Sequence, residues 1–452
     1  MKKLMSIVLA LVMALSLCVT TTWAADATEV GTVEAFKNAV SSGGAIKLTA
    51  DITLTEKLML SQDLTIDLNG HKLAQDGNEL TGDDEINAGG TFIQVIDDKT
   101  LTIIGTTPGS QVYGRINVGM AEDNNGNAVL NGGTYTCEDG NTALHVNGTC
   151  LNSNVTIKNA TITTKDNGIQ LSGKGTFLIE NSTITGYTAI YVKSGTLTIK
   201  NSTLIGNMNP VDYSYNGNGS NATGDALVVD SCEYPGGAPT ITIENSTLKG
   251  TKAAVGAYEY VKTSATHTPA NVEVKSGSLI GGVQAGITKT VTGATTDVDT
   301  TNVAPTSITF PTGTPVATNG DDYYVGSDSI ADAANSGKEM TMVQGGAIDG
   351  LEPGATIIVP QGVTGTTLNG NAAEHGYYTI ADPNAYQHEP VRRQHTTTVE
   401  DTTTTTDTKA DDTTKADTVT SAKTFDAGVA VYGVMAVLSL TGSAWVVGKK
   451  RV

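Results

Sequence analysis

The side chains best suited to bind a ligand are tyrosines and asparagines gathered in three stretches, residues 206–224, 230–239 and 258–270. Tyrosine rings stack on the faces of sugar rings and side-chain amides bind sugar hydroxyls, so this composition fits a carbohydrate site. The alternative is that the tyrosines only pin long loops to the body of the protein. The candidate ligand-binding residues are Tyr213, Tyr215, Tyr234, Tyr258, Tyr260, Asn216 and Asn218.

Catalytic carboxylates are not evident in the sequence. Glycoside hydrolysis requires two carboxyl groups that face each other across a sugar. The adjacent aspartate pairs fall in expected turns or in the C-terminal tail, where acidic pairs are usually solvated. Elsewhere, acidic and basic side chains alternate at one position of a repeat, which predicts a ladder of surface ion pairs rather than a catalytic site. The residues of this ladder are Lys158, Glu180, Lys200 and Glu244.

Metal and cofactor sites are not indicated either. The chain has six histidines without an HxxH or HExxH spacing, and its cysteines form no CxxC pair. The formal net charge is −19 and the pI is about 4.6, so nucleic acid is not the expected partner. We therefore expect no catalytic residue, no cofactor and no metal.

The elements that must position these residues come from one phrase that recurs between residues 155 and 250. It reads VTIKNATI, FLIENSTI, LTIKNSTL and ITIENSTL. The central asparagines are 22, 20 and 44 residues apart, so the last step holds two periods or one period with an insertion. A fixed period of about 20 residues indicates stacked repeats. These asparagines are Asn159, Asn181, Asn201 and Asn245.

Each phrase alternates apolar and polar residues, which predicts a strand with one buried face. A second short apolar piece follows the asparagine too closely for a hairpin, so the asparagine must occupy a bend, where its tolerance of the left-handed conformation is useful. A third piece, such as GIQL, ALHV or AIYV, follows about ten residues later. Three strands per period without hairpins or helices predict an all-β coil, whose corner asparagines form a ladder.

This pattern resembles the right-handed parallel β-helix superfamily, with the pectin-lyase-like fold, over about residues 45–290. The four asparagines match the asparagine ladder of that family. Many of its members cleave polysaccharides, but the NTD, GHG and RIK motifs of polygalacturonases are absent, and Arg115 is the only arginine on the coils. The resemblance therefore implies the fold and not an activity. A β-sandwich with similar strands is the alternative fold.

The segments around the coils are expected to have separate roles. Residues 1–24 have the pattern of a secretory signal peptide. Residues 25–292 form the β-helix, which begins with a short capping helix after Thr32; Val33, Phe36, Ala39 and Val40 share its apolar face. Residues 293–320 are a connection. Residues 321–390 are a C-terminal cap, closing coils or a small separate β domain, and include a second helix with Asp328 as its cap.

The C-terminal end is typical of an anchored protein. Residues 391–424 are rich in Thr and Asp and predict a disordered stalk. Residues 425–452 contain an apolar stretch of membrane-spanning length before a basic tail, which predicts a transmembrane helix. This order resembles surface proteins of Gram-positive bacteria, although the LPxTG motif for sortase is absent. Attachment by sortase to the cell wall and a plain membrane anchor both remain open.

Together, these features predict an exported protein of the bacterial cell surface. We expect a non-catalytic, adhesin-like β-helix that presents a binding flank to carbohydrate or to a protein of a host or neighbouring cell. The alternatives are a polysaccharide lyase or glycoside hydrolase of the β-helix type, and a passive surface spacer. An enzyme would bring acidic and basic residues together on adjacent coils, whereas a binding protein would expose rings without such convergence.

Overall fold

The computed structural model describes residues 27–75, 91–120, 124–137, 140–212, 221–230, 236–261, 268–290 and 306–382, without the side chains of 259–261 and 285–290. The chain divides into two compact units, residues 1–386 and 387–452, and only the first contains described residues. The predicted signal peptide, stalk and C-terminal span lie outside the described residues.

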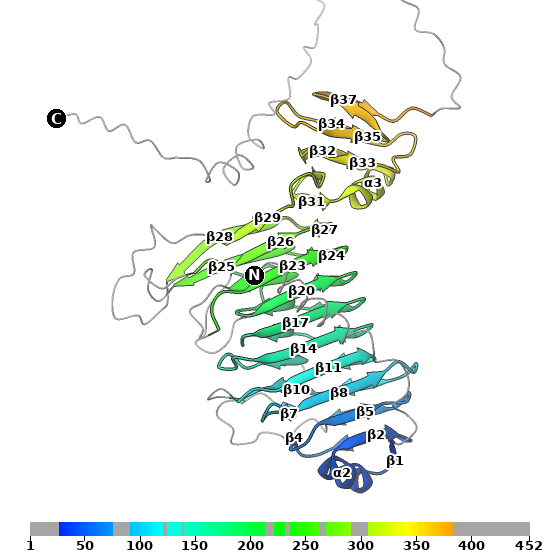
Figure 1. The fold of residues 1–452 in the computed structure, drawn as a ribbon, viewed down its shortest axis with the longest axis vertical. Coiled ribbons are helices and arrows are strands. Elements are labelled where there is room, and N and C mark those ends of the chain that lie inside the picture. The colour runs from blue at the N-terminus through cyan, green and yellow to red at the C-terminus, as the bar shows by residue number, and fades with distance from the viewer. Residues whose placement is uncertain are drawn as a thin grey trace, which may run out of the picture. The chain divides into compact units, whose positions relative to one another are not determined.

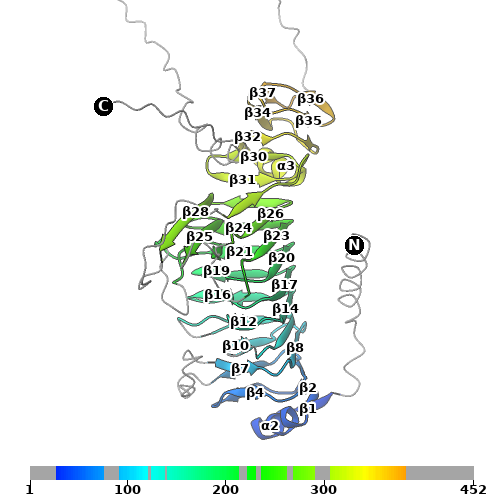
Figure 2. The ribbon, with the colours of Figure 1, turned by 60° about the vertical axis from the view of Figure 1, so that its left-hand side comes forward.

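Most described strands belong to three long sheets, in which strands from successive turns of the chain lie side by side (Figures 1 and 2). Sheet A contains, in spatial order, β1 (Thr28–Val30), β2 (Gly44–Leu48), β5 (Leu64–Asp67), β8 (Thr100–Gly105), β11 (Asn127–Gly132), β14 (Ser153–Lys158), β17 (Gly175–Glu180), β20 (Thr196–Lys200), β23 (Thr240–Glu244), β26 (Asn271–Val274) and β29 (Ser307–Thr309).

Sheet B begins with β3 (Ile52–Leu54), β6 (Lys72–Gln75), β9 (Gln111–Tyr113), β12 (Thr134–Thr136), β15 (Thr161–Thr163), β18 (Thr183–Gly186), β21 (Thr203–Gly206), β24 (Ser246–Gly250) and β27 (Gly277–Ile280). Sheet C contains β4 (Leu58–Leu60), β7 (Thr91–Val95), β10 (Arg115–Val118), β13 (Leu144–Val146), β16 (Asn167–Leu171), β19 (Thr188–Val192), β22 (Leu227–Asp230), β25 (Val255–Val261) and β28 (Val283–Thr290).

Each turn of the chain contributes one strand to every sheet, as β14, β15 and β16 do. Neighbouring coils pair in parallel and in register, so Val155, Phe177 and Leu197 stack on one another inside the molecule. These apolar side chains are buried, while the alternate residues of sheet A keep part of their surface exposed. The prediction of an all-β chain of stacked parallel strands is confirmed, and the arrangement is that of a β-helix.

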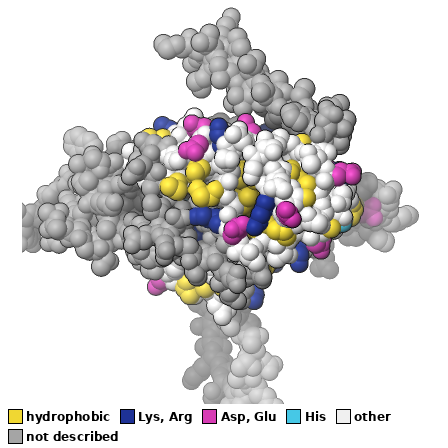
Figure 3. Space-filling model, turned by 90° about the horizontal axis from the view of Figure 1, so that it is seen from below, with side chains coloured by type: hydrophobic (Ala, Val, Ile, Leu, Met, Phe, Trp, Pro, Cys, Tyr) yellow, Lys and Arg dark blue, Asp and Glu magenta, His cyan; other side chains and the backbone are white. Residues whose placement is uncertain are grey.

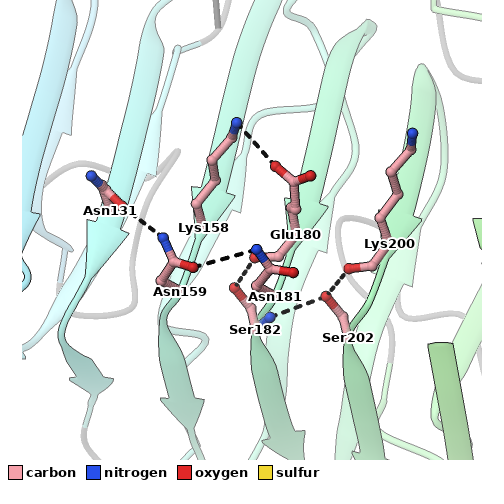
Figure 4. A network of polar contacts seen from close by, with 8 residues as sticks. All are labelled: Asn131, Lys158, Asn159, Glu180, Asn181, Ser182, Lys200 and Ser202. Atoms are coloured by element: carbon pink, nitrogen blue, oxygen red, sulfur yellow. Dashed lines mark hydrogen bonds and ion pairs between the residues drawn. The ribbon is translucent and has the colours of Figure 1, made fainter. Parts of the chain in front are cut away.

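The four repeated asparagines occupy the corner between sheets A and B. All have a left-handed backbone, with φ between 46° and 53°. Asn159 Nδ2 donates to Asn131 Oδ1 (3.1 Å), and Asn181 Nδ2 lies 3.5 Å from Asn159 Oδ1 (Figure 4). Asn245 Nδ2 donates to Asn201 Oδ1 at 3.2 Å. Asparagine is therefore favoured at this corner for two reasons: it tolerates the left-handed backbone, and its side-chain amide bonds to the next asparagine of the ladder.

A serine ladder runs beside the asparagines, and the sequence analysis did not anticipate it. The backbone N–H of Ser182 donates to Ser202 Oγ, and that of Ser202 donates to Ser246 Oγ, both at 3.1 Å. Each hydroxyl also donates to the carbonyl two residues earlier in its own coil (Figure 4). These buried hydroxyls satisfy the backbone where the strand ladder is interrupted by the bend.

Charged side chains of opposite sign face each other across neighbouring strands of sheet A. Lys158 Nζ lies 3.0 Å from Glu180 Oε2, and Lys200 Nζ lies 3.5 Å from Glu244 Oε2 (Figure 4). The predicted ion-pair ladder is therefore confirmed for these two pairs. Because all four side chains remain partly exposed, each pair contributes little to stability and chiefly specifies the register.

Helix α2 (Val33–Ser42) packs against β1, β2 and β3 at the first coil. Thr32 Oγ1 accepts a hydrogen bond from the Ala35 N–H, and Gly43 ends the helix with a φ of 70°. Phe36 and Val40 are buried as predicted, but Val33, in the first turn, is 37% exposed. Seen from this end, charged side chains of both signs are interspersed with polar ones (Figure 3).

Sheet B continues beyond the coils through antiparallel pairing of β27 with β31 (Asp322–Val325). The added strands are β31, β30 (Val316–Asn319), β32 (Glu339–Gln344), β34 (Thr356–Val359) and β37 (Gly376–Thr379). A small sheet contains β33 (Ala347–Ile348), β35 (Thr366–Leu368) and β36 (Asn371–Ala373). Strands β29 and β30 lie within residues 293–320, so the segment expected to be a simple connection carries two strands.

Helix α3 (Ser327–Asn335) packs on β31, β32 and β33 and buries Ile330 in a second hydrophobic cluster with Met340 and Ile357. The prediction that Asp328 caps this helix is wrong. Gly326, with φ 91°, is the N-cap residue and no side chain supplies the cap hydrogen bond. Asp328 lies inside the first turn, where its charge favours the positive end of the helix dipole.

One buried hydroxyl in the hydrophobic core of the coils has no hydrogen-bond partner among the described residues. Tyr135 points inward from β12, is 2% exposed, and its Oη is unsatisfied. Burying an unsatisfied hydroxyl costs about 1–3 kcal/mol. We predict that Tyr135→Phe raises the free energy of unfolding by about 1 kcal/mol or more in urea titrations. The control is Tyr258→Phe, which removes a donated hydrogen bond and should lower the free energy of unfolding. A lower free energy of unfolding in Tyr135→Phe would contradict the prediction.

Candidate functional site

The outward face of sheet C differs from those of the other two sheets because most of its described side chains are buried. Every residue of β7, β16, β19 and β22 is buried, whereas β14 and β17 of sheet A alternate buried and partly exposed residues. Registered pairing places one outward residue of each coil in a line that we call the polar column. The polar column consists of Gln94, Asn117, His145, Gln170 and Tyr191.

The first three residues of the polar column form a hydrogen-bonded relay. Gln94 Nε2 donates to the backbone carbonyl of Gly119 at 2.6 Å. Asn117 Nδ2 donates to Gln94 Oε1 at 2.9 Å, and His145 Nδ1 lies 2.7 Å from Asn117 Oδ1. Gln94 and Asn117 are fully buried, and such groups are tolerated inside a protein when their hydrogen bonds are made.

Arg115, at the start of β10, brings a positive charge to this relay. Its Nη2 lies 3.0 Å from His145 Nδ1. Burial lowers the pKa of Arg115, and the nearby Cys137 and Asp166 oppose this shift. Burial raises the pKa of Asp166, against the effects of a backbone hydrogen bond and of Arg115. Acidic and basic groups from adjacent coils therefore converge here.

His145 makes stability depend on pH. Its pKa lies well below the ordinary value because burial, Arg115 and Lys193 all disfavour the imidazolium. The unfolded chain keeps a histidine pKa of roughly 6.5, so below that pH it takes up a proton that the folded protein does not. The contribution of His145 is thus complete above about pH 6.5 and falls by up to about 1.4 kcal/mol per pH unit below it.

Urea unfolding of wild type and His145→Gln at about pH 8 and about pH 5 checks this prediction. The wild type should lose more stability on acidification than the variant. The raised pKa values of Asp166 and Asp225 act in the opposite direction, but they are present in both proteins and cancel in the comparison. Equal losses in the two proteins would show that His145 is not the responsible group.

Farther along sheet C, two buried aspartates each receive a hydrogen bond from a tyrosine. Tyr191 Oη donates to Asp230 Oδ2 at 2.6 Å, and Tyr258 Oη donates to Asp225 Oδ2 at 2.8 Å. Thr223 Oγ1 also donates to Asp225 Oδ2, at 2.6 Å. Both aspartates are fully buried. Asp225 precedes β22 and Asp230 is its last residue, so two carboxyl groups belong to one coil.

The backbone of β25 leaves room for the Asp225 carboxylate. A Cβ atom on Gly256 would lie 2.6 Å from Asp225 Oδ2 and 2.9 Å from the Tyr258 ring, so the hydrogen bond between them needs glycine at this position. Burial raises the pKa of Asp225, opposed by the hydrogen bonds from Thr223 and Tyr258 and by the charge of Lys252. A backbone hydrogen bond from Ala253 also opposes the shift. This carboxyl group can carry a proton or, when ionised, accept a hydrogen bond from a hydroxyl group.

The residues predicted to bind the ligand are only partly described. Tyr213, Tyr215, Tyr234, Asn216 and Asn218 lie outside the described residues, and Tyr260 lies on β25 without a described side chain. Tyr258 belongs to β25 rather than to an insertion, and it is 1% exposed. Its ring is therefore not available for stacking, and its hydroxyl positions Asp225.

The polar column was not predicted from the sequence, although its residues carry a signal. The third strand of each period carries His145, Gln170 or Tyr191 at its central outward position, where a solvated strand commonly carries threonine or lysine. Amide, imidazole and phenol groups at one outward position of successive coils are therefore the feature that identifies this face.

Comparison of the chain with protein-family models, with curated proteins and with solved structures finds no match in any of the three. Within the described ranges, no group of three or more His, Cys, Asp or Glu side chains is placed to hold a metal ion. The described part of the chain also has no helix that is long and apolar enough to cross a membrane. The predicted span at residues 425–452 is not among the residues searched.

Proposed function

We propose that this chain is a cell-surface-anchored, right-handed β-helix of the pectin-lyase-like superfamily that binds carbohydrate along the outward face of sheet C. One observation carries the proposal: this face holds a continuous line of amide, imidazole and phenol groups, all buried except the partly exposed His145, while the outward faces of sheets A and B carry solvated residues. A passive spacer has no use for a buried polar face, because each buried polar group must be compensated.

The chemistry of this face suits sugars. Amides and hydroxyls both donate and accept the hydrogen bonds that sugar hydroxyls require, and carboxylates accept them. The insertion that contains Tyr213 and Tyr215 precedes β22 in the sequence. Export and an anchored C-terminus present this flank to glycans or proteins outside the cell.

A glycan array with the purified protein tests the proposal. Wild type is compared with Gln170→Ala on the polar column, with Tyr213→Ala/Tyr215→Ala in the insertion, and with Thr176→Ala on the exposed face of sheet A as the control. We expect the first two variants to lose binding and the control to retain it. Equal binding by all four proteins would place the ligand elsewhere, and no binding at all would favour a protein ligand or a spacer.

The second candidate function is a polysaccharide lyase or glycoside hydrolase with an unfamiliar site. The observations that favour it are the convergence of Arg115, His145 and Asp166 on consecutive coils, and the buried Asp225 and Asp230 on one coil farther along sheet C. A carboxyl group with a raised pKa is suited to act as a general acid. Chromatography of the bound glycans decides between the candidates, since an enzyme releases oligosaccharides and a binding protein does not.

A further inference from the structure

The protonation state of His145 follows from a backbone carbonyl at the end of its relay. A carbonyl only accepts, so the Gln94 atom 2.6 Å from Gly119 O must be the amide nitrogen. Gln94 Oε1 then faces Asn117 and accepts from Asn117 Nδ2 at 2.9 Å. Asn117 Oδ1 in turn faces His145 at 2.7 Å, so Nδ1 of the ring must carry the hydrogen.

Every other arrangement brings two acceptors together. Turning the Asn117 amide places two oxygens 2.9 Å apart, and turning Gln94 as well places an oxygen 2.6 Å from the Gly119 carbonyl. A bare Nδ1 would face Asn117 Oδ1 at 2.7 Å. With a hydrogen on Nδ1, the 3.0 Å contact with Arg115 Nη2 opposes two donors, but the other arrangements oppose acceptors at the shorter distances of 2.6, 2.7 or 2.9 Å. Because positive charges surround the ring, its other nitrogen, Nε2, keeps a lone pair.

A second acceptor belongs to the residue that pairs with His145 in register on the next coil. Gln170 is the registered partner of His145, and neighbouring strands are roughly 4.8 Å apart. Gln170 Nε2 donates to Ser172 Oγ at 3.1 Å, which leaves Oε1 as the acceptor of that amide. Neither His145 Nε2 nor Gln170 Oε1 is hydrogen-bonded within the described part of the chain, and His145 keeps part of its surface exposed.

We propose that His145 Nε2 and Gln170 Oε1 form a pair of acceptors that receives two hydroxyl groups of one neutral saccharide. Two lone pairs repel an anionic oxygen, and the neighbouring charges of Arg115 and Lys193 repel a cation, so a neutral donor is the ligand that fits both conditions. Sugars carry hydroxyl pairs at about the spacing of adjacent strands. This inference rests on the proposed function and names the chemistry of its ligand.

The relay is tested without any ligand by a long-range proton–nitrogen correlation spectrum of the protein with labelled histidine. The His145→Gln spectrum identifies the His145 signals among those of the six histidines. We expect the Nε2 resonance of an unprotonated nitrogen and the Nδ1 resonance of a protonated one. A ring protonated on Nε2 at neutral pH would overturn the inference, whatever the glycan array shows.

The acceptor pair is tested with neutral hexasaccharides (cellohexaose, xylohexaose and mannohexaose) by calorimetry. We expect Gln170→Met, which leaves the relay intact, and His145→Leu each to weaken binding about fivefold to tenfold. His71→Leu is the control, because His71 lies on another coil beside Asp51. Unchanged affinity in Gln170→Met would overturn the acceptor pair while the binding function stands, and the absence of binding by wild type would overturn both. Circular dichroism checks that each variant is folded.

Discussion

Replacing Phe177 with alanine is expected to lower the free energy of unfolding by about 3–5 kcal/mol. Phe177 is 1% exposed and stacks in register between Val155 and Leu197 on the neighbouring coils. Two glycines make room for its ring: a Cβ on Gly195 would lie 2.6 Å from the ring, and a Cβ on Gly175 would lie 3.1 Å from it. Because glycine cannot fill the space that the ring leaves, the cavity in Phe177→Ala cannot collapse.

Urea unfolding followed by circular dichroism measures this effect. Phe177→Leu is the matched control, since a smaller apolar side chain at the same position should cost much less than alanine. Thr176→Ala, on the exposed face of the same strand, should change stability by about 0.5 kcal/mol or less. A loss below about 1 kcal/mol for Phe177→Ala would mean that this stack of side chains is not a packed core.

Replacing Asn181 with valine is expected to cost about 2–3 kcal/mol, through two effects of similar size. The backbone of Asn181 has a φ of 49°, where a β-branched residue is strained by about 1–2 kcal/mol. The substitution also removes the amide contact with Asn159, and a hydrogen bond contributes about 0.5–1.5 kcal/mol. Asn181 is exposed, so burial does not enter the comparison.

Asn181→Gly separates the two effects because glycine adopts this φ without strain. Its loss of stability should be roughly half that of Asn181→Val in the same urea titrations. If the two variants were equally destabilised, backbone strain would have no part in the choice of asparagine. If neither were destabilised, the corner would tolerate any residue and the repeated asparagines would need another explanation.

The sequence was less informative about the site than about the fold. Composition alone predicts the tyrosines and asparagines of the insertions as ligand-binding residues. Tyr258, whose side chain is described, is instead buried against Asp225. Asp225 and Asp230 were not selected, since nothing in their local sequence shows that tyrosines from other coils donate to them. The relay from Gly119 to His145 joins three coils, so no single stretch of sequence contains it.

The sequence by itself determined the stacked β architecture. Period-two alternation selects the buried face of each strand, and an asparagine that tolerates positive φ marks the bend at every turn, so local rules repeated at a fixed period are sufficient. The in-register ion pair of Lys158 with Glu180 was also readable, because equal spacing in the repeat becomes adjacency in the sheet.

Only the tertiary structure decided which outward face is buried and what meets there. Alternation distinguishes the inward face of a strand from its outward face, but it does not show whether the outward face is covered. The covering of that face sets the environment of His145 and Asp225. Hydrogen-bond partners such as Gln94 and Asn117 lie 23 residues apart in the chain and become neighbours through stacking. The chemistry of this protein therefore depends on contacts between coils, whereas its fold depends on patterns within them.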